Sequence, residues 1–255
     1  MQTALPNAGL AIYKSNSQRA RIATEAWGLT SLYCPACAAD GLKDSPANTK
    51  AIDFSCPDCA ATFQLKSQAK PLAGRIVDSA YSAMIRAIRE DRTPNLFVLH
   101  YGVADWRVEN LILIPHFAFP LSAIEKRKPL GPTARRAGWV GCNILLGAIP
   151  EDARIPIVSA GVARPRREVR EQYRRVKPFE RVEPEQRGWM LDVLSVLRRM
   201  RKTEFDLGEV YAHEAHLQKL HPKNRFVKDK IRQQLQVLRD AGFVRFLGRG
   251  RYEMR

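Results

Sequence analysis

The sequence predicts a mixed α/β (α+β) protein whose first part carries a four-cysteine zinc site and whose C-terminus is a winged-helix domain. Three observations support this fold class. Helical and strand patterns alternate up to about residue 165, two C-x-x-C pairs lie inside that part, and three helical patterns followed by a hairpin pattern close the chain. We expect the first domain to span residues 1–178 and the winged helix to span residues 186–255.

The first half of the chain contains the patterns expected for a core of this class. A helix is expected in "YKSNSQRARIATEAWGL", which Ser15 or Ser17 can cap. "AIDFSC" and "ATFQLKSQ" predict two strands on either side of the second cysteine pair. The spacing of Ile76, Ala80 and Met84 predicts a second helix over "LAGRIVDSAYSAMIRAIRED". "NLFVLHY", "NLILIPHFAF" and "RIPIVSAG" predict further strands, the first two in the centre of a sheet.

Four of the five cysteines have the spacing of a structural zinc site. Cys34 and Cys37 form one C-x-x-C pair, Cys56 and Cys59 form the other, and 18 residues separate the pairs. Each knuckle directs two thiolates to one point, and zinc favours four sulfur ligands in a tetrahedron. A closed set of four ligands leaves no open position, so we expect this zinc to be structural. Cys142 stands alone among apolar residues and is expected to be a buried thiol.

The charge of the chain indicates a polyanionic partner. The chain has 42 Lys and Arg against 26 Asp and Glu, a formal net charge of +16, and residues 164–255 hold 24 of the basic and 13 of the acidic residues. A concentrated positive charge favours nucleic acid, because binding releases condensed counterions. No apolar stretch is long enough to span a membrane and the N-terminus has no signal-peptide pattern. We therefore expect a cytoplasmic protein without a membrane partner.

The C-terminal pattern predicts a DNA-reading module. "RGWMLDVLSVLRRM", "DLGEVYAHEAHLQKLHP" and "NRFVKDKIRQQLQVLRDAG" predict three helices, the second capped by Asp206, and "FVRFLGRGRYEMR" predicts a hairpin turning at residues 248–250. In a winged helix the third helix enters the major groove. The side chains expected to contact DNA are Asn224, Arg225, Lys228, Arg232, Gln233 and Gln236 on that helix and Arg249 and Arg251 on the wing. The alternative is a solvated helix face in a protein-binding winged helix.

An acid, a glutamine and a lysine flank the second cysteine pair in a pattern that many metal-dependent nucleases share. Asp53 lies on one predicted strand, and Gln64 and Lys66, two residues apart, share one face of the next. Oxygen ligands on adjacent strands can hold Mg²⁺, and a lysine can orient water and stabilise charge on a phosphate. Gln64 supplies no charge, and Glu25 or Asp78 could lend a carboxylate. The alternative is that these are ordinary surface charges on a zinc hairpin.

Several longer stretches carry a resemblance to a known family. They are "YKSNSQRARIATE", "YCPAC", "DFSCPDC", "FQLKS", "RKPLGPTARRAGWVGCNI" and "KIRQQLQVLRDAGFVRFLGRGRY", which lie at both ends and in the middle of the chain. Over essentially its full length the chain resembles the DpnI-like methyl-directed restriction endonucleases, also called the Dam-replacing family. The resemblance implies a PD-(D/E)xK nuclease core with an inserted zinc site and a C-terminal winged helix. It also implies cleavage of double-stranded DNA at GATC sites whose adenine is N-methylated.

The resemblance also implies roles for individual residues. The catalytic acid falls on Asp53 and the lysine on Lys66, whereas the glutamate of the usual Glu-x-Lys motif is Gln64 here. The implied magnesium ligands are Asp53, the Gln64 carbonyl and the backbone carbonyl of Leu65. The basic loop "ARRAGWVGC" is implied to approach the modified bases through Arg135, Arg136 and Trp139, with Trp139 as the methyl sensor. The alternative for Trp139 is packing beneath a loop.

Three functional hypotheses follow. The first is a Mg²⁺-dependent type II restriction endonuclease that cuts methylated GATC sites as a monomer. The second is a catalytically weak or inactive relative that binds methylated DNA as a regulator. The third is a redox or zinc-handling protein that uses its C-x-x-C pairs, which the two matched pairs fit poorly because a thioredoxin-like motif needs one pair opening a helix.

Overall fold

The computed structural model describes residues 1–255 except residues 8, 47–48, 50 and 73. Its main body contains a seven-stranded sheet with the order β1-β2-β3-β5-β6-β9-β10. These strands are β1 (Lys43–Asp44), β2 (Phe54–Ser55), β3 (Thr62–Gln68), β5 (Asn95–Gly102), β6 (Arg107–Ile114), β9 (Ile155–Ser159) and β10 (Val162–Ala163). Strands β3 and β5 pair in parallel, whereas the other described neighbours pair antiparallel. The mixed sheet confirms the predicted α/β class.

Strands β5 and β6 form the centre of this sheet, as their apolar runs predict. Phe97, Val98 and Leu99 of β5 are completely buried, and so is Leu111 of β6. Both faces of these strands are covered, which explains why their sequences are almost continuously apolar. The ring of Phe97 stacks on the ring of Phe63 in β3, with 5.2 Å between centroids. This contact extends the core to the strand that carries Gln64 and Lys66.

Two helices and several short 3-10 turns cover the sheet. Helix α1 (Asn16–Ser31) packs along β3, and a Cβ on its Gly28 would lie 2.6 Å from the ring of Phe54, so glycine permits this close approach. Helix α3 (Arg166–Val176) packs against β9 through buried Val169 and Tyr173. The 3-10 turns are η1 (Leu10–Ile12), η2 (His116–Ala118), η3 (Leu121–Ala123), η4 (Leu146–Ala148), η5 (Glu151–Ala153) and η6 (Lys177–Arg181).

A second sheet corrects one prediction. It has the order β4-β8-β7, with β4 (Arg75–Ala80), β8 (Gly141–Leu145) and β7 (Ile124–Lys126), and β4 leads directly into α2 (Tyr81–Arg89). The helix predicted over the whole stretch was wrong before Tyr81. Ile76 and Asp78 are buried while Val77 is exposed, which is the two-residue period of a strand. The four-residue interval between Ile76 and Ala80 fits the two-residue period of a strand and the 3.6-residue period of a helix. Pairing with β8 favours the strand.

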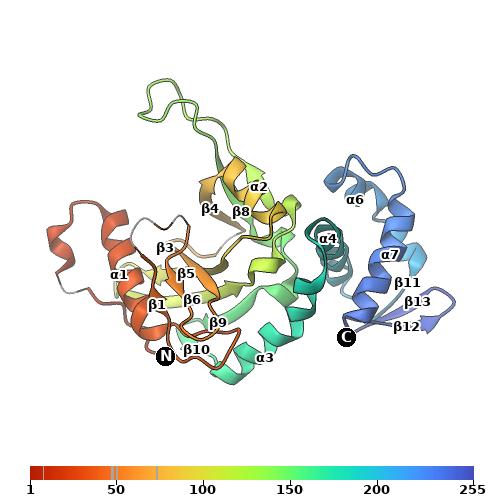
Figure 1. The fold of residues 1–255 in the computed structure, drawn as a ribbon, viewed down its shortest axis with the longest axis horizontal. Helices are drawn as coiled ribbons and strands as arrows, with labels where there is room; N and C mark the ends of the chain where they lie inside the picture. Colours follow the sequence, from red (N-terminus) through yellow and green to blue (C-terminus); the bar gives the residue numbers. More distant parts are fainter. Residues whose placement is uncertain (8, 47–48, 50, 73) are drawn as a thin grey trace.

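A long loop between β7 and β8, residues 127–140, projects away from the body (Figure 1). This stretch is basic and interrupted by glycine and proline, and β8 directly follows it. Backbone hydrogen bonds from Arg127 N to Gly141 O and from Leu130 N to Trp139 O close its base. The loop therefore begins as an extended hairpin and holds its tip far from the hydrophobic core.

The C-terminal part contains four helices and a three-stranded sheet. They are α4 (Pro184–Met200), α5 (Leu207–Tyr211), α6 (Glu214–Leu220) and α7 (Val227–Asp240), with β11 (Glu204–Asp206), β12 (Val244–Gly248) and β13 (Arg251–Met254). The second predicted helix is divided into α5 and α6, and β11 adds a strand to the predicted two-stranded wing. Asp206 caps α5 as predicted, in a reciprocal capping box with Glu209. None of the helices in the described chain is long and apolar enough to cross a membrane.

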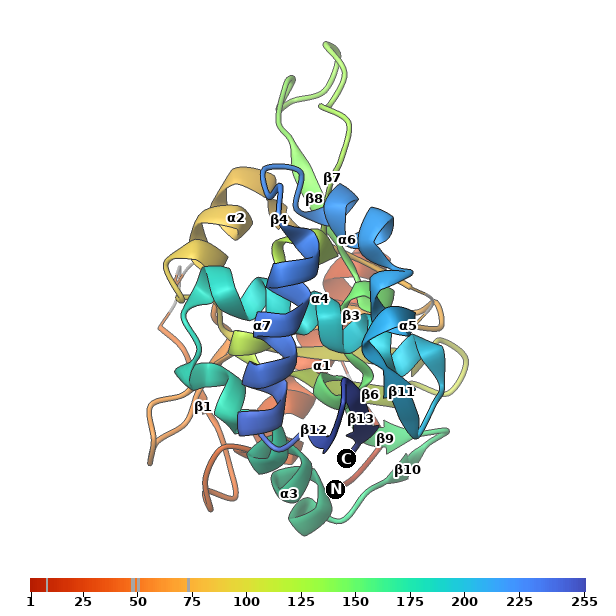
Figure 2. The same ribbon diagram turned by 90° about the vertical axis from the view of Figure 1, so that its right-hand side faces the viewer.

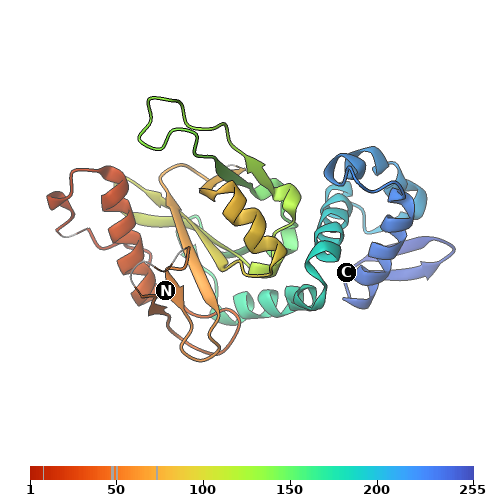
Figure 3. The ribbon, with the colours of Figure 1, turned by 45° about the horizontal axis from the view of Figure 1, so that its top comes forward.

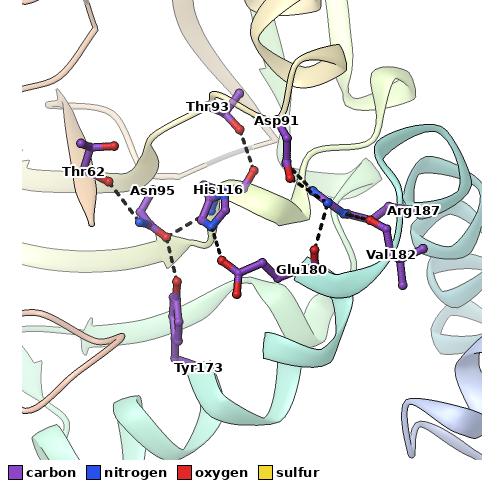
Figure 4. A network of polar contacts seen from close by, with 9 residues as sticks. All are labelled: Thr62, Asp91, Thr93, Asn95, His116, Tyr173, Glu180, Val182 and Arg187. Atoms are coloured by element: carbon purple, nitrogen blue, oxygen red, sulfur yellow. Dashed lines mark hydrogen bonds and ion pairs between the residues drawn. The ribbon is translucent and has the colours of Figure 1, made fainter. Parts of the chain in front are cut away.

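Helix α4 joins the C-terminal part to the body. It lies between the two parts in Figure 3, and α7 packs across it in Figure 2. Arg187 donates to both carboxylate oxygens of Asp91 at 2.6 and 3.0 Å, and Arg198 donates to both of Asp152 at 2.8 and 2.6 Å. Figure 4 shows the first pair beside a polar network at the beginning of β3 and β5, where Asn95 donates to the carbonyl of Thr62. Such bidentate pairs fix the geometry of both partners, so α4 belongs to both cores.

Candidate functional site

The four paired cysteines converge as their spacing predicts. The Cys34 and Cys59 Sγ atoms are 3.6 Å apart, those of Cys37 and Cys56 are 3.5 Å apart, and all four lie within 4.8 Å of one another. Four sulfurs at about 2.3 Å from a tetrahedral zinc would lie about 3.8 Å from each other. The cluster can therefore hold a zinc ion. Among the described residues, the group of possible metal ligands consists of these four thiols, without a carboxylate or histidine. This composition fits a closed structural zinc site.

The cysteine cluster joins three segments of the body. One knuckle follows α1, and the other is the turn that connects β2 to β3. On the outer side, Arg170 of α3 donates to the carbonyls of Cys34 and Ala39, at 3.2 and 2.8 Å. The cluster thus anchors the turn between the strand that follows Asp53 and the strand that carries Gln64 and Lys66.

The β2–β3 pairing places Asp53, Gln64 and Lys66 together. Phe54 lies opposite Phe63, and both rings are buried in the core. Side chains alternate along a strand, so Asp53, Gln64 and Lys66 belong to the opposite face. The Leu65 N–H donates to Asp53 Oδ2 at 2.7 Å, which holds the carboxylate at the level of the Gln-x-Lys segment.

Three oxygen atoms at this point are available to a hard cation. Asp53 uses only Oδ2 in the hydrogen bonds recorded among the described residues, and the half-buried Gln64 amide makes none there. The N–H and C=O of one strand residue point to the same side, so the Leu65 carbonyl faces the same edge as its N–H. One carboxylate oxygen, one amide oxygen and one backbone carbonyl are ligands that Mg²⁺ accepts. These residues fit a magnesium ion, with one negative charge among them.

Lys66 contacts a second acid. Its Nζ atom lies 2.8 Å from Oδ1 of Asp78 on β4, and the Asp78 side chain is only 2% exposed. Glu25, the other reserve carboxylate, instead accepts a hydrogen bond from Arg21 at 2.7 Å. The Glu25 hydrogen bond, with a smaller contribution from Asp53, raises the pKa of the Arg21 guanidinium. Arg21 is thus an exposed cation on α1 whose recorded partner is Glu25.

The fifth cysteine has no part in this chemistry. Cys142 is fully buried, and its Sγ donates to the carbonyl of Ser79 at 3.3 Å. Burial raises the pKa of its thiol to about 11, so the group is a neutral thiol at physiological pH. The prediction of a buried structural thiol is confirmed.

The basic loop holds its tryptophan close to its own base. Trp139 is half-buried, and a Cβ on Gly141 would lie 2.7 Å from its ring, so the ring lies against the Gly141 backbone. The Arg136 guanidinium lies 4.8 Å from the centre of the ring, a cation–π contact. Arg135 is exposed beside it. Trp139 thus lies on the projecting loop and not in the core of the body.

Helix α7 presents a polar face to solvent. Val227, Ile231, Leu235 and Leu238 are buried, as predicted. The outward residues predicted to contact DNA are exposed, namely Arg225, Lys228, Arg232, Gln233 and Gln236, together with Arg249 and Arg251 on the wing. Some of them have partners, since Lys228 pairs with Glu214, Arg232 with Asp229 and Arg251 with Glu204. Exposed pairs of this kind contribute little stability, so these cations can exchange their partner for a phosphate.

Asn224 and Arg225, which were predicted to lie on the third helix, precede it, because α7 begins at Val227. Asn224 and Phe226, just before α7, have roles that the sequence did not predict. The Asn224 side chain accepts a hydrogen bond from the Phe226 N–H at 2.7 Å, so its oxygen is used in the helix start. Phe226 itself is 73% exposed between Arg225 and Lys228. An aromatic residue directly before the apolar period that begins at Val227 is the signal that could have identified it. Its ring offers apolar surface where recognition helices contact base edges.

Comparisons with known families cover both parts of the chain. The family model described as the Dam-replacing family matches residues 1–181. The model described as the Dam-replacing HTH domain matches residues 185–254. The first match contains the cysteine cluster, Asp53, Gln64 and Lys66, and the second contains α7 and the wing.

Proposed function

Because the chain belongs to the Dam-replacing family, whose membership implies a restriction endonuclease with a DNA-binding HTH domain, we propose that it hydrolyses double-stranded DNA at GATC sites carrying N-methylated adenine. The proposed nuclease domain is residues 1–178, of the PD-(D/E)xK type, and the proposed winged helix is residues 186–255. Mg²⁺ is the proposed catalytic ion and zinc the structural one. The protein would act as a monomer.

One observation carries this proposal. Asp53, Gln64 and Lys66 occupy one face of a hairpin whose turn is anchored by the cysteine cluster, with the Asp53 carboxylate bonded to the Leu65 N–H. In the proposed site, Asp53, the Gln64 amide and the Leu65 carbonyl would hold Mg²⁺, which when bound supplies charge neutralisation at the phosphate and a more acidic water. This set of ligands and cation is what phosphodiester hydrolysis requires.

The chain's own residues have separate tasks in this mechanism. The Lys66 ammonium orients the attacking water and stabilises the charge that develops on the phosphoryl oxygens. Water adds to phosphorus and releases a proton to solvent, the bond from phosphorus to one deoxyribose oxygen breaks, and that oxygen takes up a proton from solvent. The task of Asp53 is to supply negative charge at a fixed position. The exposed cations of α7 and the wing hold the backbone phosphates and fix the register.

Digestion of one plasmid in two methylation states tests the proposal. The plasmid is prepared from a host that methylates adenine in GATC and from one that does not. We expect fragments whose ends map to GATC only from the methylated plasmid, only with Mg²⁺ or Mn²⁺, and none after chelation. Cleavage of both plasmids alike would contradict methyl dependence, and no cleavage at any ion concentration would contradict the nuclease.

A second candidate function rests on the residue at position 64. Gln64 offers an amide where an acid would bring a second negative charge to the ion. A weakened site favours a protein that binds methylated DNA and cuts slowly or not at all, as a regulator would. Retarded migration of methylated but not unmethylated duplex, without strand breaks, would support this candidate over the first.

The Gln64→Glu variant is expected to lower the Mg²⁺ concentration for half-maximal cleavage by roughly tenfold, because ligand charge strengthens the binding of hard cations. Titration of Mg²⁺ in single-turnover digestion of methylated duplex measures this change. The matched control is Gln68→Glu on the same strand, whose amide donates to the carbonyls of Lys70 and Pro71 and should leave the ion requirement unchanged. Equal ion requirements for wild type and Gln64→Glu would remove Gln64 from the ligand set.

The Trp139→Ala variant is expected to reduce the preference for methylated over unmethylated DNA by about 5- to 150-fold, the range of roughly 1–3 kcal/mol for a good base contact. The reason is that the apolar ring would bury more contact area against a methylated base than against an unmodified one, so its removal weakens binding of methylated DNA more. Competition binding with the two duplexes measures the ratio. Trp106→Ala is the control, since Trp106 is equally half-buried but stacks on Tyr101 away from this loop. An unchanged ratio would assign Trp139 to packing alone.

A further inference from the structure

Asp78 is the most deeply buried acid in contact with the candidate active site. Its side chain is 2% exposed, and its Oδ1 atom lies 2.8 Å from Nζ of Lys66, whose side chain is 28% exposed. A carboxylate buried to this extent is strongly unfavourable unless a cation faces it. The pair is therefore a specific arrangement of the site, and it joins the main sheet to the second one.

The backbone around Asp78 is arranged to aim this side chain. The register between β4 and β8 shifts between Val77 and Ala80, and Asp78 lies in the shifted segment. Bulges of this kind redirect side chains and are frequent next to active sites. The Cys142 Sγ bonds to Ser79 O inside the same irregularity and holds it in place. The charges that act on this thiol are those of Asp78, Lys66 and Arg127.

Asp78 and Glu25, the two acids that could lend a carboxylate, differ in burial and in the cation that each contacts. Glu25 is 35% exposed on α1 and is bonded to Arg21, so it shares its charge with an exposed cation. Asp78 faces Lys66 from the inner side. The side chains of Asp53, Gln64, Lys66 and Asp78 carry a net charge of −1, which would be zero without Asp78.

We infer that Asp78 is a positioning residue, which holds the Lys66 ammonium over the face shared with Asp53 and Gln64 and supplies the negative charge that Gln64 lacks. The inference rests on the proposed function for the use of the site. Its physical content is independent of cleavage, because it concerns where the ammonium lies and how strongly a divalent cation is attracted. Asp78 touches neither DNA nor the reacting atoms in this role.

Mn²⁺ binding to the DNA-free protein tests the charge contribution. We expect Asp78→Asn to weaken Mn²⁺ binding at least tenfold in an electron paramagnetic resonance titration, and Asp78→Asn with Gln64→Glu to restore it. Asp152→Asn is the matched control, because Asp152 is also paired, with Arg198, but lies outside the site. Wild-type Mn²⁺ affinity in Asp78→Asn would overturn the inference.

Single-turnover cleavage of methylated duplex tests the positioning role. Asp78→Asn is expected to cut at least 100-fold more slowly, and the double variant to remain slow despite its restored Mn²⁺ binding. Asp78→Glu keeps the charge but displaces the ammonium, so it should bind Mn²⁺ within twofold of wild type and cut at least tenfold more slowly. If thermal unfolding shows that Asp78→Asn does not fold, Asp78→Glu alone decides, and wild-type cleavage by it would overturn the inference.

The two tests separate the inference from the proposed function. A wild-type protein that binds Mn²⁺ but cuts no DNA contradicts the nuclease, and the Mn²⁺ titration of the variants still decides the role of Asp78. A wild-type protein that binds no Mn²⁺ overturns both.

Discussion

Replacing Lys66 with alanine is expected to slow cleavage of methylated DNA by at least about 10³-fold, while binding of the same duplex stays within roughly threefold. The ammonium acts on charge that develops in the transition state, so its loss raises the barrier and has little effect on ground-state binding. Many exposed cations on α7, the wing and the basic loop remain to hold the phosphates. Single-turnover digestion and gel retardation in the presence of Ca²⁺ measure the two quantities separately.

Lys70→Ala provides the matched control for this experiment. Lys70 follows the same strand but is exposed and has no ion pair among the described residues. Its loss should change cleavage by less than about twofold, the size of a single screened surface charge. Unchanged cleavage by Lys66→Ala would show that Lys66 only balances the buried Asp78, and the hydrolytic site would have to be sought elsewhere.

Removing the zinc ligands is expected to have the largest effect on stability. Cys37→Ser or Cys56→Ser should lower the free energy of unfolding by at least about 3 kcal/mol, because metal binding to such sites contributes directly to folding. The cluster joins the end of α1, the β2–β3 turn and α3, so three segments lose their anchor together. Chemical denaturation, with zinc measured in the purified protein, follows this loss, and we expect one zinc per chain in wild type.

Cys142→Ala distinguishes zinc loss from the general cost of altering a buried cysteine. Cys142 is as buried as Cys34 but lies outside the cluster. This variant should keep one zinc per chain and lose only roughly 1 kcal/mol, the value for a small buried group and one weak hydrogen bond. A folded, zinc-free Cys56→Ser protein with wild-type stability would contradict the structural role of the cluster.

The predicted elements are confirmed where the local sequence pattern is compatible with only one secondary structure. The strands around Phe97 and Leu111, the helix α1, the capping role of Asp206 and the turn at residues 248–250 follow from apolar runs, periodicity and residue preference. The helix prediction for the residues before Tyr81 was wrong, because the four-residue interval between Ile76 and Ala80 is compatible with a strand as well as with a helix. Phe226 was not predicted, because an aromatic residue next to an apolar helical period is usually buried, and only the structure shows that its ring is exposed.

By itself the sequence determined the cysteine quartet, the shared face of Gln64 and Lys66 on β3 and the helical face of α7. Each depends on residues within a few positions of one another or on a fixed alternation of side chains along a strand. Asp53, which was predicted to lie on a strand, directly precedes β2. Only the tertiary structure decided that Asp78 pairs with Lys66 and that Glu25 accepts a hydrogen bond from Arg21. It also decided that two arginines of α4 form ion pairs with Asp91 and Asp152. Those contacts join separate elements, and their partners are selected by the packing of sheets and helices, which no local period specifies.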